Sequence, residues 1–320
     1  FQISAVQSYD DGGQFVLEPE LDTLIILERQ QSVEGAVTFL APKWRRSLSL
    51  TLGGGLSWQR RQLLDDALNV SSDFALNRET IRFANYRVGL NFNSTRTHAF
   101  QMGTTRGVAV FLGGGLEQEL ALPDSVSGVE GVDRSLAEVT GQIRGAIPLW
   151  GGGFAQHVLA IRASGGVASG PGAGPLEYRV GGASGQQESL TGLELFGGNF
   201  LFFPVRGYET SSRFGRYAWS ASAEYRFPLL LVNRGFRAWP VHLDRAIGSI
   251  FFDAGNAWGP DISATGFENP LQLALASVGA EATAEVLGLY DIVLRLRGGV
   301  GFPLVQGDGP RFWLRVGLPF

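Results

Sequence analysis

The sequence lacks cysteine, and it has only one methionine and three histidines among its 320 residues. Without cysteine, neither a disulfide framework nor a thiolate metal site can form. The histidines, His98, His157 and His242, are far apart and have no partner at helical spacing. A zinc site or a histidine-based catalytic triad is therefore not expected, and we predict no metal, no cofactor and no catalytic residue.

Long apolar runs are also absent. No window of about 18 residues is both uncharged and continuously apolar, whereas a helix that crosses the hydrocarbon needs about 20 such residues. A membrane-spanning helix is therefore not predicted. If the chain lies in a membrane, it must cross with closed strands, because backbone groups in lipid need internal partners.

Signals for nucleic-acid binding and for enzymatic chemistry are missing as well. The net charge is −4 and no basic block stands out, so a nucleic-acid partner is not expected. The sequence has no HExxH, G-x-S-x-G or GxxxxGK[ST] motif. The glycine runs at 53–55, 113–115 and 151–153 lack a strand-to-helix context, so we expect them to relieve crowding or bend strands.

Glycine and aromatic residues are abundant instead, with 45 Gly, 22 Phe, 7 Trp and 7 Tyr. Small residues suit a crowded barrel interior, and aromatic rings collect where a barrel meets the membrane interfaces. Strand-like segments recur along the whole chain between clusters of Gly, Pro, Asp and Asn, without a sustained helical period. The sequence therefore predicts an all-β fold.

Three segments alternate most clearly: Arg46 to Trp58, Tyr217 to Leu229 and Asp291 to Phe302. In each, every second residue is largely apolar, and the residues between are small, polar or charged. A soluble β-sandwich or β-propeller would bury the apolar faces against each other, whereas a barrel in lipid turns them outward. The pattern alone leaves both open, but segments of about 10 to 13 residues match a bilayer better than the usual soluble strand.

We predict a transmembrane antiparallel β-barrel of about 14 to 16 strands, because single-chain bacterial barrels have even strand numbers, with 16 favoured if strands are absent at the start. The whole chain, 1–320, forms this one domain. A periplasmic region and some first strands are expected ahead of Phe1, because the N-terminus lacks a signal peptide. The predicted strands lie near 1–8, 14–28, 33–41, 46–60, 80–93, 105–119, 134–148, 154–168, 175–183, 216–230, 246–258, 270–286, 288–302 and 310–320.

The final strand ends on an aromatic residue, and its alternate positions are apolar. One face has Trp313 and Arg315, and the other face has Phe312, Leu314, Val316, Leu318 and Phe320. An apolar face opposite an arginine suits a wall between lipid and a watery lumen.

The stretch from Gly181 to Gly215 is too long for a hairpin turn, so 184–215 is predicted as one long functional loop. It contains the sequence Val205-Arg206-Gly207-Tyr208. The strand segments that follow contain Glu224 and Asp253 at positions that alternate with apolar residues, so both carboxylates can point inward.

In this order, the motifs VRGY, EYRFP and FFDAG resemble those of the Omp85 superfamily, the BamA/TpsB-like outer-membrane barrels with a bacterial surface antigen domain. The resemblance covers about Leu176 to Phe320. It implies an extracellular loop that folds into the lumen, with Val205, Arg206, Gly207 and Tyr208 at its tip. It further implies that Glu224 and Asp253 are the acidic partners of Arg206, and that the final strand is a targeting signal.

Such a contact is physically sensible, because a guanidinium presents a rigid fork that fits carboxylate oxygens. Gly207 would allow a positive φ beside it. Two features depart from the family pattern. The Gly181-Gly182 pair is separated from Arg206 by a long insertion, and a second insertion at 232–242 is expected to form a periplasmic turn.

Three functions remain open at this stage. The first is an outer-membrane barrel that assists insertion or translocation of proteins. The second is an anchor or exporter for a separate periplasmic or passenger domain, and the third is a passive diffusion channel. The expected partners are outer-membrane lipids, client or passenger proteins and accessory assembly proteins, and the expected location is the bacterial outer membrane.

Overall fold

The computed structural model describes residues 2–10, 25–64, 80–98, 100–120, 135–172, 178–182, 202–235, 241–259, 274–288 and 292–317. All regular elements in these ranges are β-strands. Among the described residues, no helix has the length and apolarity needed to cross a membrane. The strands are β1 (Gln2–Asp10), β2 (Ile25–Lys43), β3 (Arg46–Leu64), β4 (Thr80–Asn93), β5 (Gly107–Glu119), β6 (Leu136–Gly152), β7 (Ala155–Ser169), β8 (Tyr178–Val180), β9 (Phe202–Phe203), β10 (Arg213–Gly215), β11 (Tyr217–Gly235), β12 (Val241–Trp258), β13 (Leu275–Gly288), β14 (Ile292–Pro303) and β15 (Arg311–Gly317).

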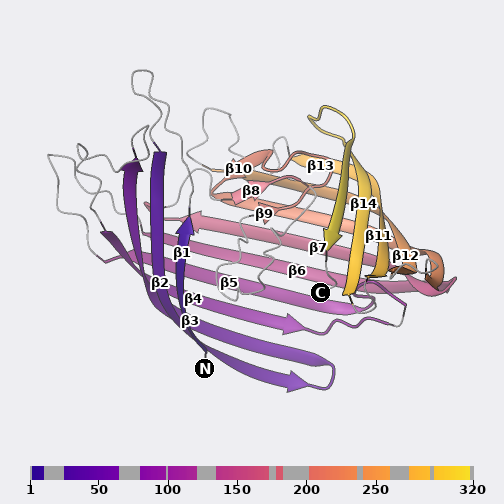
Figure 1. Ribbon diagram of the computed structural model, residues 1–320, viewed down its shortest axis with the longest axis horizontal. Helices are drawn as coiled ribbons and strands as arrows, with labels where there is room; N and C mark the ends of the chain where they lie inside the picture. The colour runs from indigo at the N-terminus through magenta and orange to yellow at the C-terminus, as the bar shows by residue number, and fades with distance from the viewer. Residues whose placement is uncertain are drawn as a thin grey trace.

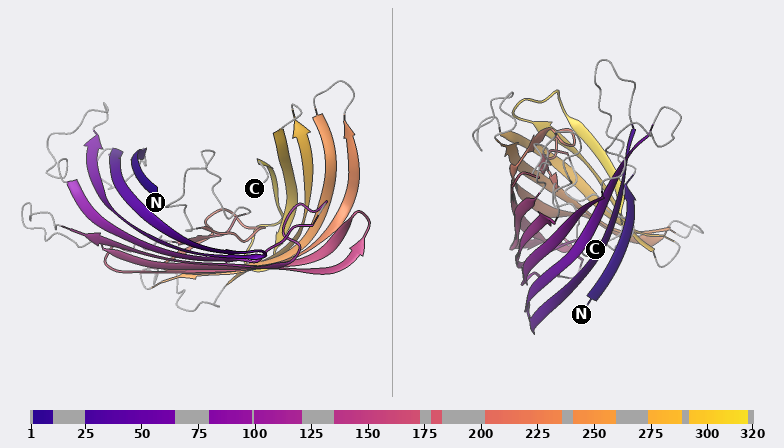
Figure 2. Two further views of the ribbon diagram at one scale, coloured as in Figure 1. Left: turned by 90° about the horizontal axis from the view of Figure 1, so that it is seen from below. Right: turned by 90° about the vertical axis from the view of Figure 1, so that its left-hand side faces the viewer.

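Twelve of these strands form one antiparallel sheet in the order β1-β2-β3-β4-β5-β6-β7-β11-β12-β13-β14-β15 (Figure 1). Each strand pairs with its neighbour in the sequence, except that β7 pairs with β11 across the long insertion. The sheet curves into a deep trough, and its two edges rise on opposite sides (Figure 2). The remaining strands, β8 to β10, form a small separate sheet on the concave side of the trough.

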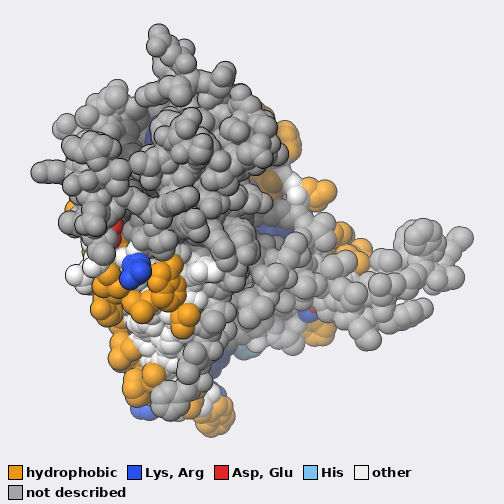
Figure 3. Space-filling view, turned by 60° about the vertical axis from the view of Figure 1, so that its left-hand side comes forward, with side chains coloured by type: hydrophobic (Ala, Val, Ile, Leu, Met, Phe, Trp, Pro, Cys, Tyr) orange, Lys and Arg blue, Asp and Glu red, His pale blue; other side chains and the backbone are white. Residues whose placement is uncertain are grey.

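The two faces of the large sheet have opposite character, as alternation predicted. On β12, Ile250 and Phe252 are 55% and 47% exposed on the convex face, whereas Asp253 is completely buried on the concave face. Exposed apolar side chains continue over the convex face of the other long strands, and Figure 3 shows hydrophobic side chains gathered on part of this surface. No second sheet covers these side chains in the part of the chain described here, so the soluble sandwich alternative is wrong.

The structure corrects three details of the predicted strands. The segments near 14–28 and 33–41 are not separate where they are described, because β2 runs without a break through the polar sequence Glu28 to Ser32 and pairs with both β1 and β3. The segment at 175–183 is not a strand of the large sheet, because its central residues form β8 of the small sheet. The expected turn at 232–242 is shorter, because β11 continues to Gly235 and β12 begins at Val241.

Closure and the full strand count stay predictions. Among the described residues, β1 and β15 are the edges of the twelve-stranded sheet and do not pair with each other. The predicted number of about 14 to 16 strands therefore refers to a complete barrel.

Candidate functional site

The described end of the predicted loop 184–215 lies on the concave wall formed by the C-terminal half of the sheet. Its residues 202–215 include β9 and β10, which pair with β8 on either side. Residues 183–201 lie outside the described residues. A buried apolar cluster attaches the small sheet to the wall, and its members are Ala168, Tyr178, Val180, Phe203, Val205, Tyr208, Ala218, Ala257 and Leu275.

Arg206 at the loop tip makes a two-pronged contact with Asp253 on β12. Its Nε donates to Oδ2 of Asp253 at 2.7 Å, and its Nη2 donates to Oδ1 at 2.8 Å. The backbone N–H of Arg206 also donates to Oδ2 at 3.1 Å, and Ser222 donates to Oδ1 at 2.6 Å. Both partners are buried, with Arg206 only 5% exposed. This fork geometry is the strongest form of arginine–carboxylate contact.

Two further carboxylates surround the same guanidinium. Nη1 of Arg206 lies 3.5 Å from Oε2 of Glu224 on β11 and 3.9 Å from Oε2 of Glu281 on β13. Burial opposes the charge on Arg206, but the hydrogen bond and charge of Asp253, together with Glu224 and Glu281, raise its pKa above the ordinary arginine value. Arg206 is therefore a cation with three carboxylates around its guanidinium.

The flat face of the guanidinium is covered by an aromatic ring. The Arg206 Cζ atom lies 3.6 Å from the ring centroid of Phe251, which is itself buried on the concave face of β12. A guanidinium over a desolvated ring gains a cation–π attraction. The edge of the Arg206 guanidinium is thus bound by the carboxylate of Asp253, and its face packs on the ring of Phe251.

Gly207 and Tyr208 connect the tip to the other side of the wall. Gly207 has a φ of +92°, and its backbone passes close to Gly301 on β14. The Tyr208 hydroxyl lies 2.7 Å from the carbonyl oxygen of Ala276 and 2.5 Å from that of Val305. The tip therefore contacts four consecutive strands, from β11 to β14, and the turn beyond them.

Tyr208→Phe tests the contact of the Tyr208 hydroxyl with the backbone of Ala276 and Val305. We expect it to lower the free energy of unfolding by at least about 1 kcal/mol, because the hydrogen bonds of the hydroxyl with the backbone of Ala276 and Val305 are lost while the ring keeps its packing. Urea unfolding in lipid vesicles would measure the change. Tyr86→Phe is the matched control, since Tyr86 is exposed on the convex face. Equal losses in both variants would contradict the role of the Tyr208 hydroxyl.

The Gly181-Gly182 pair lies beside the loop tip in spite of the long insertion. Gly182 forms an antiparallel bridge with Val205, and the Gly181 N–H donates to the Phe203 carbonyl at 3.0 Å. Both glycines have positive φ, at +124° and +84°. A Cβ on Gly181 would lie 2.5 Å from the Glu209 carbonyl oxygen, so this close approach needs glycine. The glycine pair and the loop tip are therefore neighbours in space, although a long insertion lies between them in the sequence.

Side chains from the last strand reach the same region. The Trp313 indole N–H donates to Oε2 of Glu281 at 3.1 Å, and Glu281 also pairs with Arg297 on β14. Arg311 pairs with Glu209 just beyond the loop tip at 2.6 Å. The loop tip and β15 are thus joined through a shared carboxylate and a second ion pair.

The structure brings together most of the residues predicted for the site. Val205, Arg206, Gly207 and Tyr208 lie at the described end of the loop, and Glu224 and Asp253 lie on the wall against Arg206. Sequence reasoning missed Phe251 and Glu281. Phe251 could have been found, because it is two residues from Asp253 and therefore on the same face of a strand. Nothing in the sequence alone marks Glu281.

The predicted C-terminal targeting strand is described only in part. Phe312 and Leu314 are exposed on the convex face, and Val316 pairs with Leu296 in the ladder. Leu318 and Phe320 lie outside the described residues.

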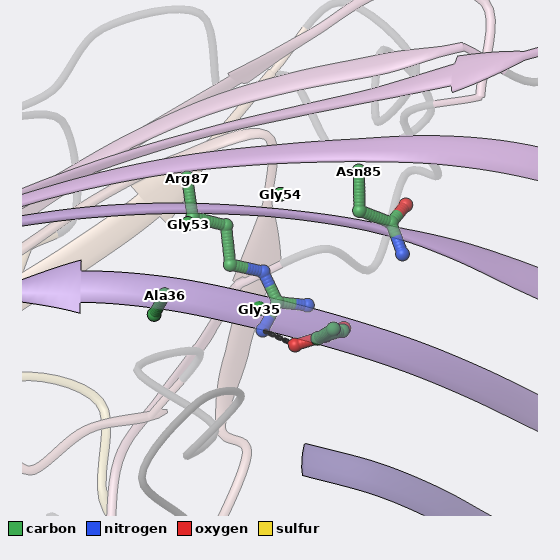
Figure 4. A pocket seen from close by; sticks show the side chains of 7 residues that line it. Gly35, Ala36, Gly53, Gly54, Asn85 and Arg87 are labelled. Carbon is green, nitrogen blue, oxygen red and sulfur yellow. Dashed lines mark ion pairs between the residues drawn. The ribbon is translucent and has the colours of Figure 1, made fainter. Parts of the chain in front are cut away.

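The glycine run at 53–55 makes room for side chains. Figure 4 shows Arg87 extending from β4 toward β2, where it forms an ion pair with Glu34 at 3.5 Å. Gly53 and Gly55 of β3 lie between these strands on the same face. A Cβ on Gly55 would lie 2.7 Å from the Glu34 side chain, so the hollow here is a space for ion pairing rather than a phosphate cradle.

Comparison with known proteins supports the fold. Searches against protein-family models and against curated proteins found no match. Among solved structures, the chain is similar to BamA from Haemophilus ducreyi lacking POTRA domains 1-3, with a TM-score of 0.53, 16% identity and coverage of 92% of this chain and 55% of that one. It is also similar to CdiB from Escherichia coli, with a TM-score of 0.51, 13% identity and coverage of 99% and 49%.

These likenesses define the class of fold. At such low identity they show architecture alone, and the chain spans about half the length of each neighbour. The fold is all-β, with one large curved antiparallel sheet whose architecture is similar to that of BamA and CdiB.

Proposed function

We propose that this chain is an outer-membrane barrel that assists the insertion or translocation of proteins, with the lumenal loop as an internal brace. The observation that carries the proposal is the buried contact between Arg206 and Asp253, with Glu224 beside it. A loop attached to the inner wall in this way would occupy part of the lumen, so the barrel would not be an open pore. The likeness to BamA and CdiB supports the same assignment.

The proposed mechanism involves no covalent chemistry. Arg206, Glu224 and Asp253 are structural, and no catalytic residue, metal or cofactor is required. Client or passenger proteins would be handled at a weak seam between the first and last strands of the complete barrel, with outer-membrane lipids and accessory assembly proteins as further partners.

A client-folding experiment tests this function. The barrel is reconstituted into lipid vesicles, and an unfolded outer-membrane barrel protein is diluted from urea onto them. We expect the client to fold several times faster than on protein-free vesicles, measured by its shift on a semi-native gel. Equal rates with and without this chain would reject an assembly function and favour an anchor or exporter for a separate domain.

Conductance separates the proposal from a passive channel. In planar bilayers a barrel with a braced loop should give small, flickering currents, whereas a diffusion channel gives large and steady ones. Large, steady currents from the wild-type chain would favour the channel.

The sequence upstream of this chain discriminates between assembly and anchoring, since POTRA repeats favour assembly and a propeller or hydrolase favours anchoring.

A further inference from the structure

A group of cations lies at the rim of the sheet opposite the long loop, on two neighbouring connections. The first is the turn between β2 and β3, and the second joins β4 to β5. We use the term basic rim for Lys43, Arg46, Arg96 and Arg106, all of which are exposed. The two connections are adjacent, because β3 pairs with β4 up to Ser47 and Asn93.

The ladder places these cations directly opposite one another. Lys43 and Arg46 are partners in the last pair of the β2–β3 ladder. Arg96 and Arg106 are partners in an isolated antiparallel bridge, with N–H to carbonyl distances of 2.8 and 3.3 Å. Like charges directly opposite each other destabilise a pair of strands. An anion placed between two such pairs would offset their repulsion.

The stretches around the basic rim contain no acidic residue. Residues 40–50, 93–110 and 139–152, which cover both connections and the adjoining end of β6, contain no Asp or Glu. A negative charge from outside the chain can therefore offset these cations.

The position of the basic rim identifies the source of that charge. By alternation, Lys43 and Arg46 lie on the convex face with Phe39 and Leu48, which are exposed apolar residues. The cations thus lie just past the end of the apolar surface. Trp44 between them is 92% exposed, with the Arg45 guanidinium 5.0 Å from its ring centroid. Exposed tryptophan beside cations at the end of an apolar band is typical of a lipid headgroup region.

We propose that the basic rim binds the phosphate of an anionic phospholipid in the adjoining leaflet, with the acyl chains along the apolar face. This inference rests on the proposed membrane location but not on any action upon client proteins. The phosphate would lie between the two cation pairs and turn a repulsive arrangement into an attractive one.

Native mass spectrometry of the purified chain tests the binding. The protein is released from micelles that contain equal amounts of phosphatidylglycerol and phosphatidylcholine. We expect wild type to retain phosphatidylglycerol in preference to phosphatidylcholine. The K43Q/R46Q/R96Q/R106Q variant should retain at least about tenfold less phosphatidylglycerol than wild type. R179Q is the control, because Arg179 is an exposed arginine on the small sheet. Equal retention by wild type and the fourfold variant would overturn the proposal.

A second measurement uses heat resistance on a semi-native gel and needs no client. In phosphatidylcholine alone, K43Q/R46Q should be at least as heat resistant as wild type, because repulsion is relieved. With phosphatidylglycerol the order should reverse, and K43R/R46K should behave as wild type. The same order in both lipids would reject lipid binding. Retention of inorganic phosphate together with equal amounts of the two lipids would also reject it, because the rim would then bind free phosphate and not a lipid headgroup.

Discussion

Arg206→Ala is expected to lower the free energy of unfolding by about 3 to 5 kcal/mol, because it leaves the carboxylate of Asp253 buried without its partner. Asp253 is completely buried and receives three hydrogen bonds from Arg206. The variant should convert to its unfolded form at a lower temperature on a semi-native gel. Urea unfolding in vesicles would give the free energy.

Two controls separate this contact from a general effect of charge. Glu209→Gln removes the exposed ion pair with Arg311 next to the tip, and it should cost less than about 1 kcal/mol. The double variant R206A/D253A should regain part of the loss, because both buried charges are gone. Unchanged heat resistance of Arg206→Ala would contradict a stabilising role of the contact between Arg206 and Asp253.

Gly301→Ala is expected to displace the loop tip by adding one methyl group. A Cβ at this position would lie 2.7 Å from both the Cα and the N atom of Gly207, which is closer than carbon atoms normally approach. Backbone cannot rotate away as a side chain does, so the tip must move and strain the contacts of Arg206 and Tyr208. Overpacking of this kind costs about 1 to 3 kcal/mol. Unfolding in vesicles measures the loss.

Gly298→Ala is the matched control on the same strand. Its Cβ would lie 3.5 Å from the nearest atom, a side-chain carbon of Leu314, which is ordinary contact. We expect little change from this variant. In addition, Gly301→Ala should cost much less in the Arg206→Ala background, because the tip is already loosened. Fully additive losses would show that Gly301 acts independently of the loop tip.

The predicted faces of the strands depended only on local sequence. Side chains alternate between the two faces of any strand whatever its neighbour is, so the exposed Ile250 and Phe252 and the buried Asp253 could be assigned before the structure. The same parity placed Glu224 on the concave face. The motif order then predicted which arginine these carboxylates meet.

The arrangement of strands relative to one another could not be obtained in this way. The polar sequence from Glu28 to Ser32 suggested a break, but hydrogen bonds to strands on both sides keep β2 continuous. The segment at 175–183 alternates like a wall strand, yet it pairs with loop residues. Pairing partners are set by contacts between distant residues, which a pattern along the chain does not contain.

By itself, then, the sequence determined the all-β class, the apolar and polar faces of the strands, and the residues of the contact between Arg206, Glu224 and Asp253. Only the tertiary structure decided that Gly182 pairs with Val205 across the insertion, that Phe251 covers Arg206, and that Glu281 joins Arg206 to Trp313. The reason is physical. Alternation is a property of one strand, whereas these contacts depend on the register and curvature of several strands at once.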